Sequence, residues 1–250
     1  MRLEKESNQT RRSLVEDITR WIGLQVNSAG ARGAVVGMSG GLDSSVTALL
    51  CKRALGDKLL GLILPCHSHP LDQQHAHMVA DRFDISAERI DLGPVFDLLL
   101  STLPTGGKLP VANLKPRLRM MTLYYYSNRL DYFVAGSGNK SELMTGYFTK
   151  YGDGGVDILP LGGLLKTEVR ELAQELGVPE EIRAKPPSAG LWSGQTDEGE
   201  LGITYEELDR ALQMVYSGEK GEPDDESLST VRELIEQSQH KRAPIPIYEP

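Results

Sequence analysis

A glycine- and serine-rich segment near the N-terminus has the residue types of a phosphate-binding loop. The segment, Ser39-Gly40-Gly41-Leu42-Asp43-Ser44-Ser45, lies between a predicted strand at 34–38 and a helical pattern that ends at Gly56. In such a turn the backbone N–H groups and the helix dipole point at one place, and adjacent glycines allow close approach of the backbone. A plain turn with Asp43 or Ser44 as helix cap would have a similar composition. The segment therefore predicts a phosphate site, with a simple helix cap as the alternative.

Asp43 distinguishes this segment from a Walker loop. The G-x-x-x-x-G-K-[ST] spacing is missing, and a carboxylate stands where that loop carries its lysine. A carboxylate beside phosphates would be repelled unless a divalent cation bridged them. The loop therefore predicts Mg²⁺ together with a nucleotide.

A second glycine-containing loop, Gly136-Ser137-Gly138-Asn139-Lys140-Ser141, also follows an apolar run, and Asp157 lies roughly where a dinucleotide fold places its ribose-binding acid. Ser141 replaces the third glycine of that fingerprint, which disfavours a hydride-transferring Rossmann enzyme.

Apolar runs and helical patterns alternate along the chain. Short apolar runs predict strands at 34–38, 59–64, 90–92 and 132–136. Helical patterns besides the one that ends at Gly56 occupy 9–27, 71–83, 110–130, 166–176 and 225–242. This order predicts an α/β fold, a doubly wound parallel sheet with helices on both faces, plus C-terminal helices. Ligands bind at the carboxyl ends of such strands, so we expect functional loops after Met38, Leu64 and Gly136.

Three local patterns refine this prediction. Apolar residues four apart mark one face of the first helix: Leu14, Ile18, Ile22 and Val26. A similar face is expected in the last helix, from Leu228, Val231, Leu234 and Ile235. Thr204 and Glu207 have the spacing of a capping box. The segment 184–203 is rich in proline, glycine and serine, and we expect a mobile loop that orders over a ligand.

Composition and charge limit the class of protein. The chain has 250 residues, 40% of them hydrophobic, and a net charge of −8, which indicates a globular protein that we expect to form a single domain over 1–250. No apolar stretch is long enough to cross a membrane or to act as a signal peptide, so we expect a cytoplasmic protein. The acidic balance disfavours nucleic acid as a partner. Five cations without an acidic neighbour predict a local anion site: Lys108, Lys115, Arg117, Arg119 and Arg129.

Two clusters permit more than one interpretation. Four histidines, His67, His69, His75 and His77, follow Cys66 and could ligate zinc, but their spacing matches no structural zinc pattern, so a solvated or adenine-adjacent loop is favoured. The run Tyr124-Tyr125-Tyr126 could stack on a base. Consecutive helical residues point in different directions, which favours packing in a core and at a subunit interface.

Five blocks together resemble one known family. The loop Ser39–Ser45 resembles the pyrophosphate loop of the ATP pyrophosphatases. Four further blocks resemble NAD synthetase in particular, and in the order of that family: 113–120, 141–161, 185–189 and 240–242. The resemblance implies an adenine nucleotide alpha hydrolase-like fold. It also implies a ligase that adenylates the nicotinic acid carboxylate of deamido-NAD with ATP, releases pyrophosphate, and lets ammonia displace AMP.

The resemblance also implies a role for individual residues. The ATP phosphates would bind to the loop Gly37, Met38, Ser39, Gly40, Gly41, Leu42, Asp43 and Ser44. Further ATP contacts would come from Ser137, Lys166 and Ser188, and Mg²⁺ would bind to Asp43 and Glu142. Deamido-NAD would bind to Arg117, Lys150, Asp157, His240 and Lys241, and the catalytic residues would be Asp43, Lys150 and Lys166. A homodimer is implied, because the dinucleotide site of the family lies at the subunit interface.

The sequence departs from the family pattern at two places. Ser137 and Ser188 stand where threonine is common, which keeps the hydroxyl. Gly138-Asn139-Lys140 differs from the Asp-His-Ala of many bacterial members, which puts adenine-side contacts in doubt.

Three alternatives remain at this point. A tRNA-thiolating ATP pyrophosphatase is disfavoured by the acidic charge and the lack of paired cysteines. A non-catalytic nucleotide sensor is disfavoured by the joint presence of Asp43, Glu142 and Lys166. Glutamine as the nitrogen donor would need an activated nucleophile, and the chain offers only Cys51 and Cys66. Free ammonia is therefore the expected donor.

Overall fold

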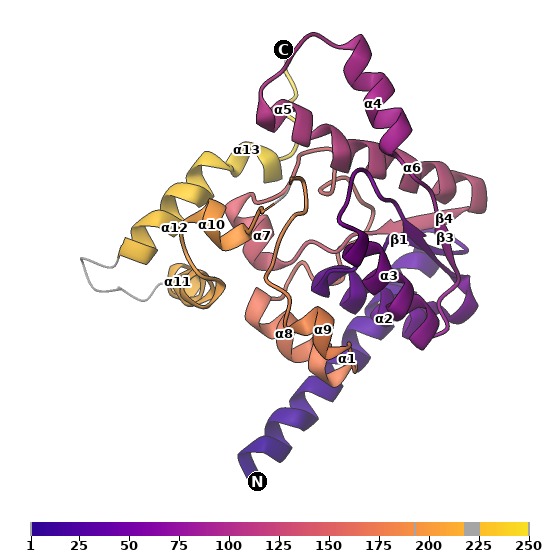
Figure 1. Ribbon diagram of the computed structural model, residues 1–250. Coiled ribbons are helices and arrows are strands. Elements are labelled where there is room, and N and C mark those ends of the chain that lie inside the picture. Colours follow the sequence, from indigo (N-terminus) through magenta and orange to yellow (C-terminus); the bar gives the residue numbers. More distant parts are fainter. Residues whose placement is uncertain (1, 193, 218–225, 250) are drawn as a thin grey trace.

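Four parallel strands form the centre of the protein (Figure 1). The computed structural model describes residues 2–192, 194–217 and 226–249. The strands are β1 (Gly33–Gly37), β2 (Leu59–Ile63), β3 (Ala87–Arg89) and β4 (Tyr132–Ala135), in the spatial order β3-β2-β1-β4. This confirms the predicted doubly wound α/β fold.

Helices cover both faces of the sheet because the strands are apolar on both sides. Along β2, Leu59 and Ile63 enter one apolar core, while Leu60 and Leu62 enter the other. The first core is closed by α1 (Arg2–Ser28), α2 (Leu42–Leu55), α3 (Pro70–Arg82) and α8 (Lys166–Glu175). The second is closed by α4 (Gly93–Thr102) and α6 (Leu114–Leu130). Short elements, η1 (Gly56–Lys58) and α5 (Lys108–Ala112), connect the larger ones.

The strand order creates a switch point between β1 and β4. From β1 the chain moves outward to β2 and β3, and then returns to the other side of β1 as β4. Val36 pairs with Ala135 near the carboxyl ends of these two strands. The loops that follow β1 and β4 therefore leave the sheet side by side, which is where α/β folds bind ligands.

The C-terminal helices form a third apolar cluster beside the sheet (Figure 1). It is built from α10 (Asp197–Leu201), α11 (Tyr205–Ser217) and α12 (Glu226–Gln237), and α13 (Gln239–Arg242) follows α12. The short helix α9 (Glu180–Arg183) instead packs Ile182 into the first core. Leu228 and Val231 are buried in the third cluster and Leu234 and Ile235 pack against it, as the sequence predicts. Thr204 and Glu207 form the expected capping box, with Glu207 N–H donating to Thr204 Oγ1 at 3.3 Å.

The long first helix follows the predicted pattern. Ile22 and Val26 are buried, Leu14 and Ile18 pack against the same core, and Arg11 pairs with Glu171 of α8 at 2.9 Å. Within the described part of the chain, no helix is long and apolar enough to cross a membrane.

Four details differ from the sequence prediction. The third strand is Ala87–Arg89 rather than 90–92, and 110–130 is broken at Asn113 into α5 and α6. The helices α4, α7 (Lys140–Thr145) and α9 were not predicted. The segment 184–203 contains a helix, α10, instead of loop alone.

Candidate active site

The loop after β1 makes a tight turn into α2. Ser44 Oγ donates to Gly41 O at 3.0 Å and lies 2.9 Å from Ser39 Oγ. Gly40 has φ of +76°, and a Cβ there would lie 2.0 Å from the carbonyl oxygen of Asp72. Only glycine fits this position, because the loop rests on the start of α3.

Helix α2 begins without a side-chain cap. The residue before it is Gly41, and no hydrogen bond from a capping side chain is found among the described residues. The simple helix-cap alternative, with Asp43 or Ser44 as cap, is therefore wrong. The first N–H groups of α2 face the end of the sheet, an arrangement that suits an anion.

Asp43, Glu142 and Lys166 meet beside this loop. Lys166 Nζ lies 2.5 Å from Asp43 Oδ2 and 3.4 Å from Glu142 Oε1. The lysine side chain is 3% exposed, and the carboxylates are 17% and 18% exposed. Three elements distant in sequence, α2, α7 and α8, thus bring two carboxylates around one ammonium.

Burial and charge shift the pKa values of this cluster. Burial, together with the neighbouring Asp43, raises the pKa of Glu142 to about 8, although Lys166 opposes that shift. Burial alone would lower the pKa of Lys166, but the carboxylates of Asp43 and Glu142 more than offset this and raise it. Lys166 is therefore a permanently charged group in the ligand-free protein.

Asn139 connects the two carboxylates. Its side-chain amide donates to Asp43 Oδ1 at 3.0 Å, and its Oδ1 accepts from Glu142 N–H at 3.0 Å. Asn139 is the N-cap of α7 and forms a capping box with Glu142. The spacing Asn139-x-x-Glu142 was visible in the sequence, but the segment was interpreted as a loop.

A buried network places α7 and α8 relative to each other. Ser141 Oγ donates to Asp209 of α11 and accepts from Lys166 N–H at 3.0 Å. Asp209 also accepts from Thr167 N–H at 2.8 Å. Asp209 therefore holds the starts of the helices that carry Glu142 and Lys166. Sequence reasoning missed it, because nothing in its local pattern indicates these partners.

Asp197 attaches the 184–203 segment to the same region. It accepts from Ala189 N–H at 2.9 Å and from Tyr205 Oη at 3.2 Å, and burial raises its pKa. The Tyr205 ring lies 5.1 Å from Lys166 Nζ. Ser188, an expected ATP contact, is exposed and immediately precedes Ala189. Ser137 is half-buried in the loop that joins β4 to α7.

A second cluster contains the expected deamido-NAD residues. Lys150 Nζ donates to His240 O at 2.6 Å, and Arg117 donates to Lys150 O at 3.4 Å. Lys241 Nζ donates to Gly146 O at 2.6 Å, and burial lowers its pKa. The structure thus brings Arg117, Lys150, His240 and Lys241 into one connected set at the end of α7.

Asp157 lies apart from these residues. Its carboxylate accepts from Val134 N–H at 2.8 Å and from Tyr124 Oη at 2.9 Å. The aspartate is exposed and sits against β4 and α6. Lys150, expected beside Lys166 as a catalytic residue, belongs to the second cluster, where its Nζ bonds to His240 O and lies 5.4 Å from the centre of the Tyr151 ring.

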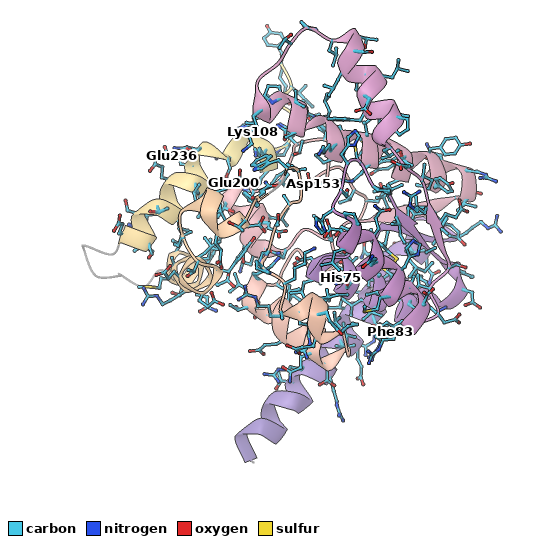
Figure 2. The ribbon with its side chains drawn as sticks, viewed as in Figure 1. His75, Phe83, Lys108, Asp153, Glu200 and Glu236 are labelled. Carbon is cyan, nitrogen blue, oxygen red and sulfur yellow. The ribbon has the colours of Figure 1, made fainter. Side chains whose placement is uncertain are left out.

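The basic stretch 108–129 is only partly a surface charge cluster. Arg119 donates to Leu64 O at 3.1 Å and to Ser68 Oγ at 3.1 Å. Lys115 donates to Leu191 O at 2.8 Å, and burial lowers its pKa. Lys108 at the start of α5 is labelled in Figure 2, and its Nζ lies 3.8 Å from the centre of the Trp192 ring. Together with Arg117, which donates to Lys150 O, four of the five cations therefore contact loops.

The histidine and tyrosine clusters do not form compact sites. His67 bonds to Asp97 at 2.7 Å, His69 caps α3 and His75 is buried on α3. Tyr124 and Tyr126 bond to different carboxylates, and Tyr125 is 64% exposed. The Tyr125 and Tyr126 rings lie edge to face with their centroids 5.7 Å apart, while Tyr124 reaches a carboxylate on another segment.

Magnesium fits the two carboxylates only in combination with a substrate. Within the described ranges, no group of three or more His, Cys, Asp and Glu residues is arranged to hold a metal ion. Asp43 Oδ2 and Glu142 Oε1 nevertheless face the same position, which the ammonium group of Lys166 occupies. Mg²⁺ is commonly bound by one or two carboxylates together with substrate phosphates and waters, so the donor set fits.

Comparison with known proteins identifies the family. The sequence profile of the family described as NAD synthase matches residues 14–245. The NH₃-dependent NAD⁺ synthetase of Finegoldia magna is 49% identical over 230 residues, which are 92% of each chain. The NMN synthetase of Francisella tularensis has a TM-score of 0.87 at 36% identity, covering 95% of this chain and 98% of that one.

A further solved structure agrees with this result. The NH₃-dependent NAD synthetase of Campylobacter jejuni has a TM-score of 0.83 at 25% identity, covering 96% of this chain and 99% of that one. These matches favour the synthetase over the tRNA-thiolating enzyme and the nucleotide sensor. The chain therefore belongs to the NAD synthetase family, the ligases that form a C–N bond in the ATP-dependent amidation of deamido-NAD by ammonia.

Proposed function

We propose that Asp43, Glu142 and Lys166 form the catalytic centre of this NAD synthetase. The observation that supports this proposal is the meeting of the three side chains at the switch point of the sheet, beside the uncapped start of α2. The reaction begins when a carboxylate oxygen of deamido-NAD attacks the α-phosphorus of ATP. A new O–P bond forms, and the bond from that phosphorus to pyrophosphate breaks. Ammonia then attacks the acyl carbon, and AMP leaves with the former carboxylate oxygen.

ATP is the substrate that this loop is suited to hold. The backbone of Gly37, Met38, Ser39, Gly40, Gly41 and Leu42, with Asp43 and Ser44, would surround its phosphates. Ser137 and Ser188 would contact ATP from the loop before α7 and from the 184–203 segment. The N–H groups of α2 favour the negative charge.

Lys166 would stabilise the charge that develops at the α-phosphorus. Its neighbours keep it protonated, and its burial removes the water that would screen it. Asp43 Oδ2 and Glu142 Oε1 would hold Mg²⁺ with the phosphates, and the ion would supply electrostatic stabilisation when bound. Lys166 would then turn from the carboxylates towards a phosphate oxygen.

Deamido-NAD would bind over the second cluster. Arg117, Lys150, His240 and Lys241 are linked by their backbone contacts, and Asp157 would contribute from the β4 side. Lys150 would act on the bound dinucleotide and reach the reacting atoms only in the complex. The chain would work as one synthetase domain over 1–250, in the cytoplasm and without nucleic acid or membrane partners.

A homodimer is supported by apolar side chains exposed beside this cluster. Met121 and Tyr125 are four residues apart on α6 and are 63% and 64% exposed. Arg117 is four residues before Met121 and is also exposed, so it lies on the same face. A second subunit on this face would cover the apolar side chains and complete the dinucleotide site.

The acceptor has a second candidate. The similarity to the Francisella tularensis NMN synthetase favours testing nicotinic acid mononucleotide beside deamido-NAD. We expect deamido-NAD to give the higher kcat/KM, because it alone would use the full set of Arg117, Lys150, His240 and Lys241. Both acceptors, each with ATP, Mg²⁺ and ammonium, would be compared by chromatography of NAD, nicotinamide mononucleotide and AMP. A higher kcat/KM for the mononucleotide would contradict the dinucleotide assignment.

The proposed centre is tested by Asp43→Asn and Glu142→Gln. Each variant should keep its fold by circular dichroism, lose most of its turnover and need more Mg²⁺ for half-maximal activity. Unchanged Mg²⁺ dependence in both variants would remove these carboxylates from the site.

A further inference from the structure

Asn139 occupies a place between the two carboxylates that the expected site roles leave unexplained. It is completely buried. Its side-chain amide donates to Asp43 Oδ1 at 3.0 Å, and its backbone N–H donates to Glu142 Oε2 at 3.2 Å. Lys166 lies against the other oxygen of each carboxylate, Asp43 Oδ2 and Glu142 Oε1. Each carboxylate therefore has one oxygen on Asn139 and one on the lysine.

Helix capping accounts for only part of this arrangement. Asn139 Oδ1 accepts from Glu142 N–H at 3.0 Å and so caps α7. Serine and aspartate cap helices about as well as asparagine. The contact with Asp43, which lies 96 residues earlier in the chain, needs a donor on a side chain of this length. Neither a serine nor an ionised aspartate supplies one.

We infer that Asn139 is a positioning residue. It fixes the side chains of Asp43 and Glu142 so that the carboxylate oxygens not bonded to Asn139, Asp43 Oδ2 and Glu142 Oε1, face the same point. The inference rests on the proposed function, in which these oxygens share the cation that accompanies ATP. Two neighbouring carboxylates repel each other, and Lys166 holds them together only until it turns towards a phosphate. Asn139 bonds to both carboxylates without using the oxygens that face Lys166. Its contacts can therefore persist through the reaction.

The loss of this contact should change the site more than the fold. Without the amide, Asp43 can rotate away from Glu142, and a displacement of about 1 Å in a catalytic group can cost about 10²-fold in rate. The capping hydrogen bond to Glu142 N–H can survive in a serine or aspartate variant. The two effects of Asn139 are therefore separable.

Three variants distinguish the capping of α7 by Asn139 from its contact with Asp43. Asn139→Ser and Asn139→Asp keep a capping oxygen and lose the donor to Asp43, whereas Asn139→Ala loses both. Thr204→Ala removes an equivalent capping box from the exposed start of α11 and serves as the matched control. Each protein would be studied by thermal unfolding, by Mn²⁺ titration with ATP followed by electron paramagnetic resonance, and by kcat and KM for ATP.

We expect Asn139→Ser to unfold within a few degrees of wild type, to bind Mn²⁺ with ATP more weakly, and to lose roughly 10–100-fold in kcat with a smaller change in KM. Asn139→Asp should lose about as much turnover as Asn139→Ser. Because serine is neutral and aspartate adds a negative charge, similar losses would show that the missing donor to Asp43, and not the charge, is the cause. Thr204→Ala should lose stability but keep its Mn²⁺ binding and kcat.

Two results would overturn the inference in different ways. If the serine and aspartate variants match wild type in Mn²⁺ binding and kcat, Asn139 is only a helix cap. If wild type itself makes NAD without a divalent cation, the proposal of a shared cation site is wrong, and this inference is wrong with it. If Asn139→Asp fails to fold, Asn139→Ser decides alone.

Discussion

Lys166 is the residue on which the ligand-free site depends most strongly. It is the buried cation between Asp43 and Glu142, and removing one member of a buried ion pair typically costs about 3–5 kcal/mol. Lys166→Met should therefore lower Tm, and added Mg²⁺ should raise Tm more in this variant than in wild type. Its kcat should fall far more than its affinity for deamido-NAD, because the charge matters most in the transition state.

Thermal shift with and without Mg²⁺, together with kinetics at saturating deamido-NAD, checks this prediction. Lys52→Met is the matched control, since Lys52 pairs with Asp57 at 3.0 Å at the surface of α2. A weakened affinity for deamido-NAD with unchanged turnover would contradict the catalytic role of Lys166.

The two cysteines are poor nucleophiles in the folded protein. Complete burial raises the pKa of Cys51 to about 12. Burial also raises the pKa of Cys66, although Arg119 and Lys115 oppose that shift. For both cysteines the raised pKa means that the neutral thiol dominates at pH 8 and that the thiolate forms only above the ordinary thiol pKa. A thiol reagent at pH 8 should label neither cysteine quickly, and unfolding in guanidinium should release both.

The same thiol chemistry predicts the nitrogen donor. Hydrolysis of glutamine requires an activated nucleophile, and neither cysteine supplies one. Ammonium salts should support NAD formation, with a rate at fixed total ammonium that rises as pH increases the unprotonated fraction. Robust NAD formation by ammonia-free enzyme with ATP, Mg²⁺, deamido-NAD and glutamine would contradict this, unless a glutaminase had copurified.

At the site, the sequence predicted the residues that belong to recognisable motifs. It did not predict residues that reach the site only because the chain folds back on itself. Asp43, Glu142 and Lys166 belong to recognisable blocks, and the structure places them in contact. Asp209 bonds to the starts of the helices that carry Glu142 and Lys166, and Asp197 bonds to Tyr205, whose ring lies 5.1 Å from Lys166 Nζ. No local pattern reveals such partners. Asn139 was the exception, because its capping spacing to Glu142 was present in the sequence.

Among the elements, strand prediction depended on apolar runs and failed where the strand is exposed. All three residues of β3 are exposed, so Ala87–Arg89 shows no apolar signal. The apolar run at 90–92 follows it, and Ile90 N–H still donates to Ile63 O at 3.0 Å. The buried strands β1, β2 and β4 were predicted within about a residue, because burial on both faces leaves continuous apolar runs.

Three lysines hold the 184–203 segment against the site, one within the segment and two from α5 and α6. Lys185 pairs with Asp72 of α3, Lys115 donates to Leu191 O at 2.8 Å, and Lys108 covers Trp192. Closure over an acyl-adenylate would keep water from hydrolysing it. Lys185→Met should therefore raise the rate at which protease cuts 184–203 in the ligand-free enzyme, and ATP with deamido-NAD should protect both forms.

Mass spectrometry of limited digests would locate the cuts, with Lys52→Met again as the surface control. Equal cleavage rates with and without both ligands would show that the segment does not order over them.

For the whole molecule, an acidic chain has to bind anionic substrates. The chain carries −8, yet both of its nucleotide substrates are anions. We expect the attraction to be local, from the N-terminus of α2, from Lys166 and from the Arg117, Lys150 and Lys241 set. An acidic composition that disfavours nucleic acid as a partner is therefore compatible with a nucleotide site.

The exposed face of α6 predicts how two molecules associate. Met121 and Tyr125 are more than half exposed, and α4 beside them exposes Leu98 at 67%. Stable interfaces bury about 1,200–2,000 Å² in total and place apolar side chains at their centre. We expect wild type to be a dimer by light scattering at micromolar concentration. Met121→Glu with Tyr125→Glu should give a folded monomer, because two carboxylates would be buried without partners.

Because Arg117 lies on the same face, this monomer should also have a raised KM for deamido-NAD and lower NAD synthesis, while ATP binding changes little. Leu24→Glu on α1 introduces the same side chain at a residue that is 59% exposed and should leave both mass and activity as in wild type. A wild-type monomer with full activity would remove the second subunit from the site. A dimer that persists in the double variant would move the interface to another face.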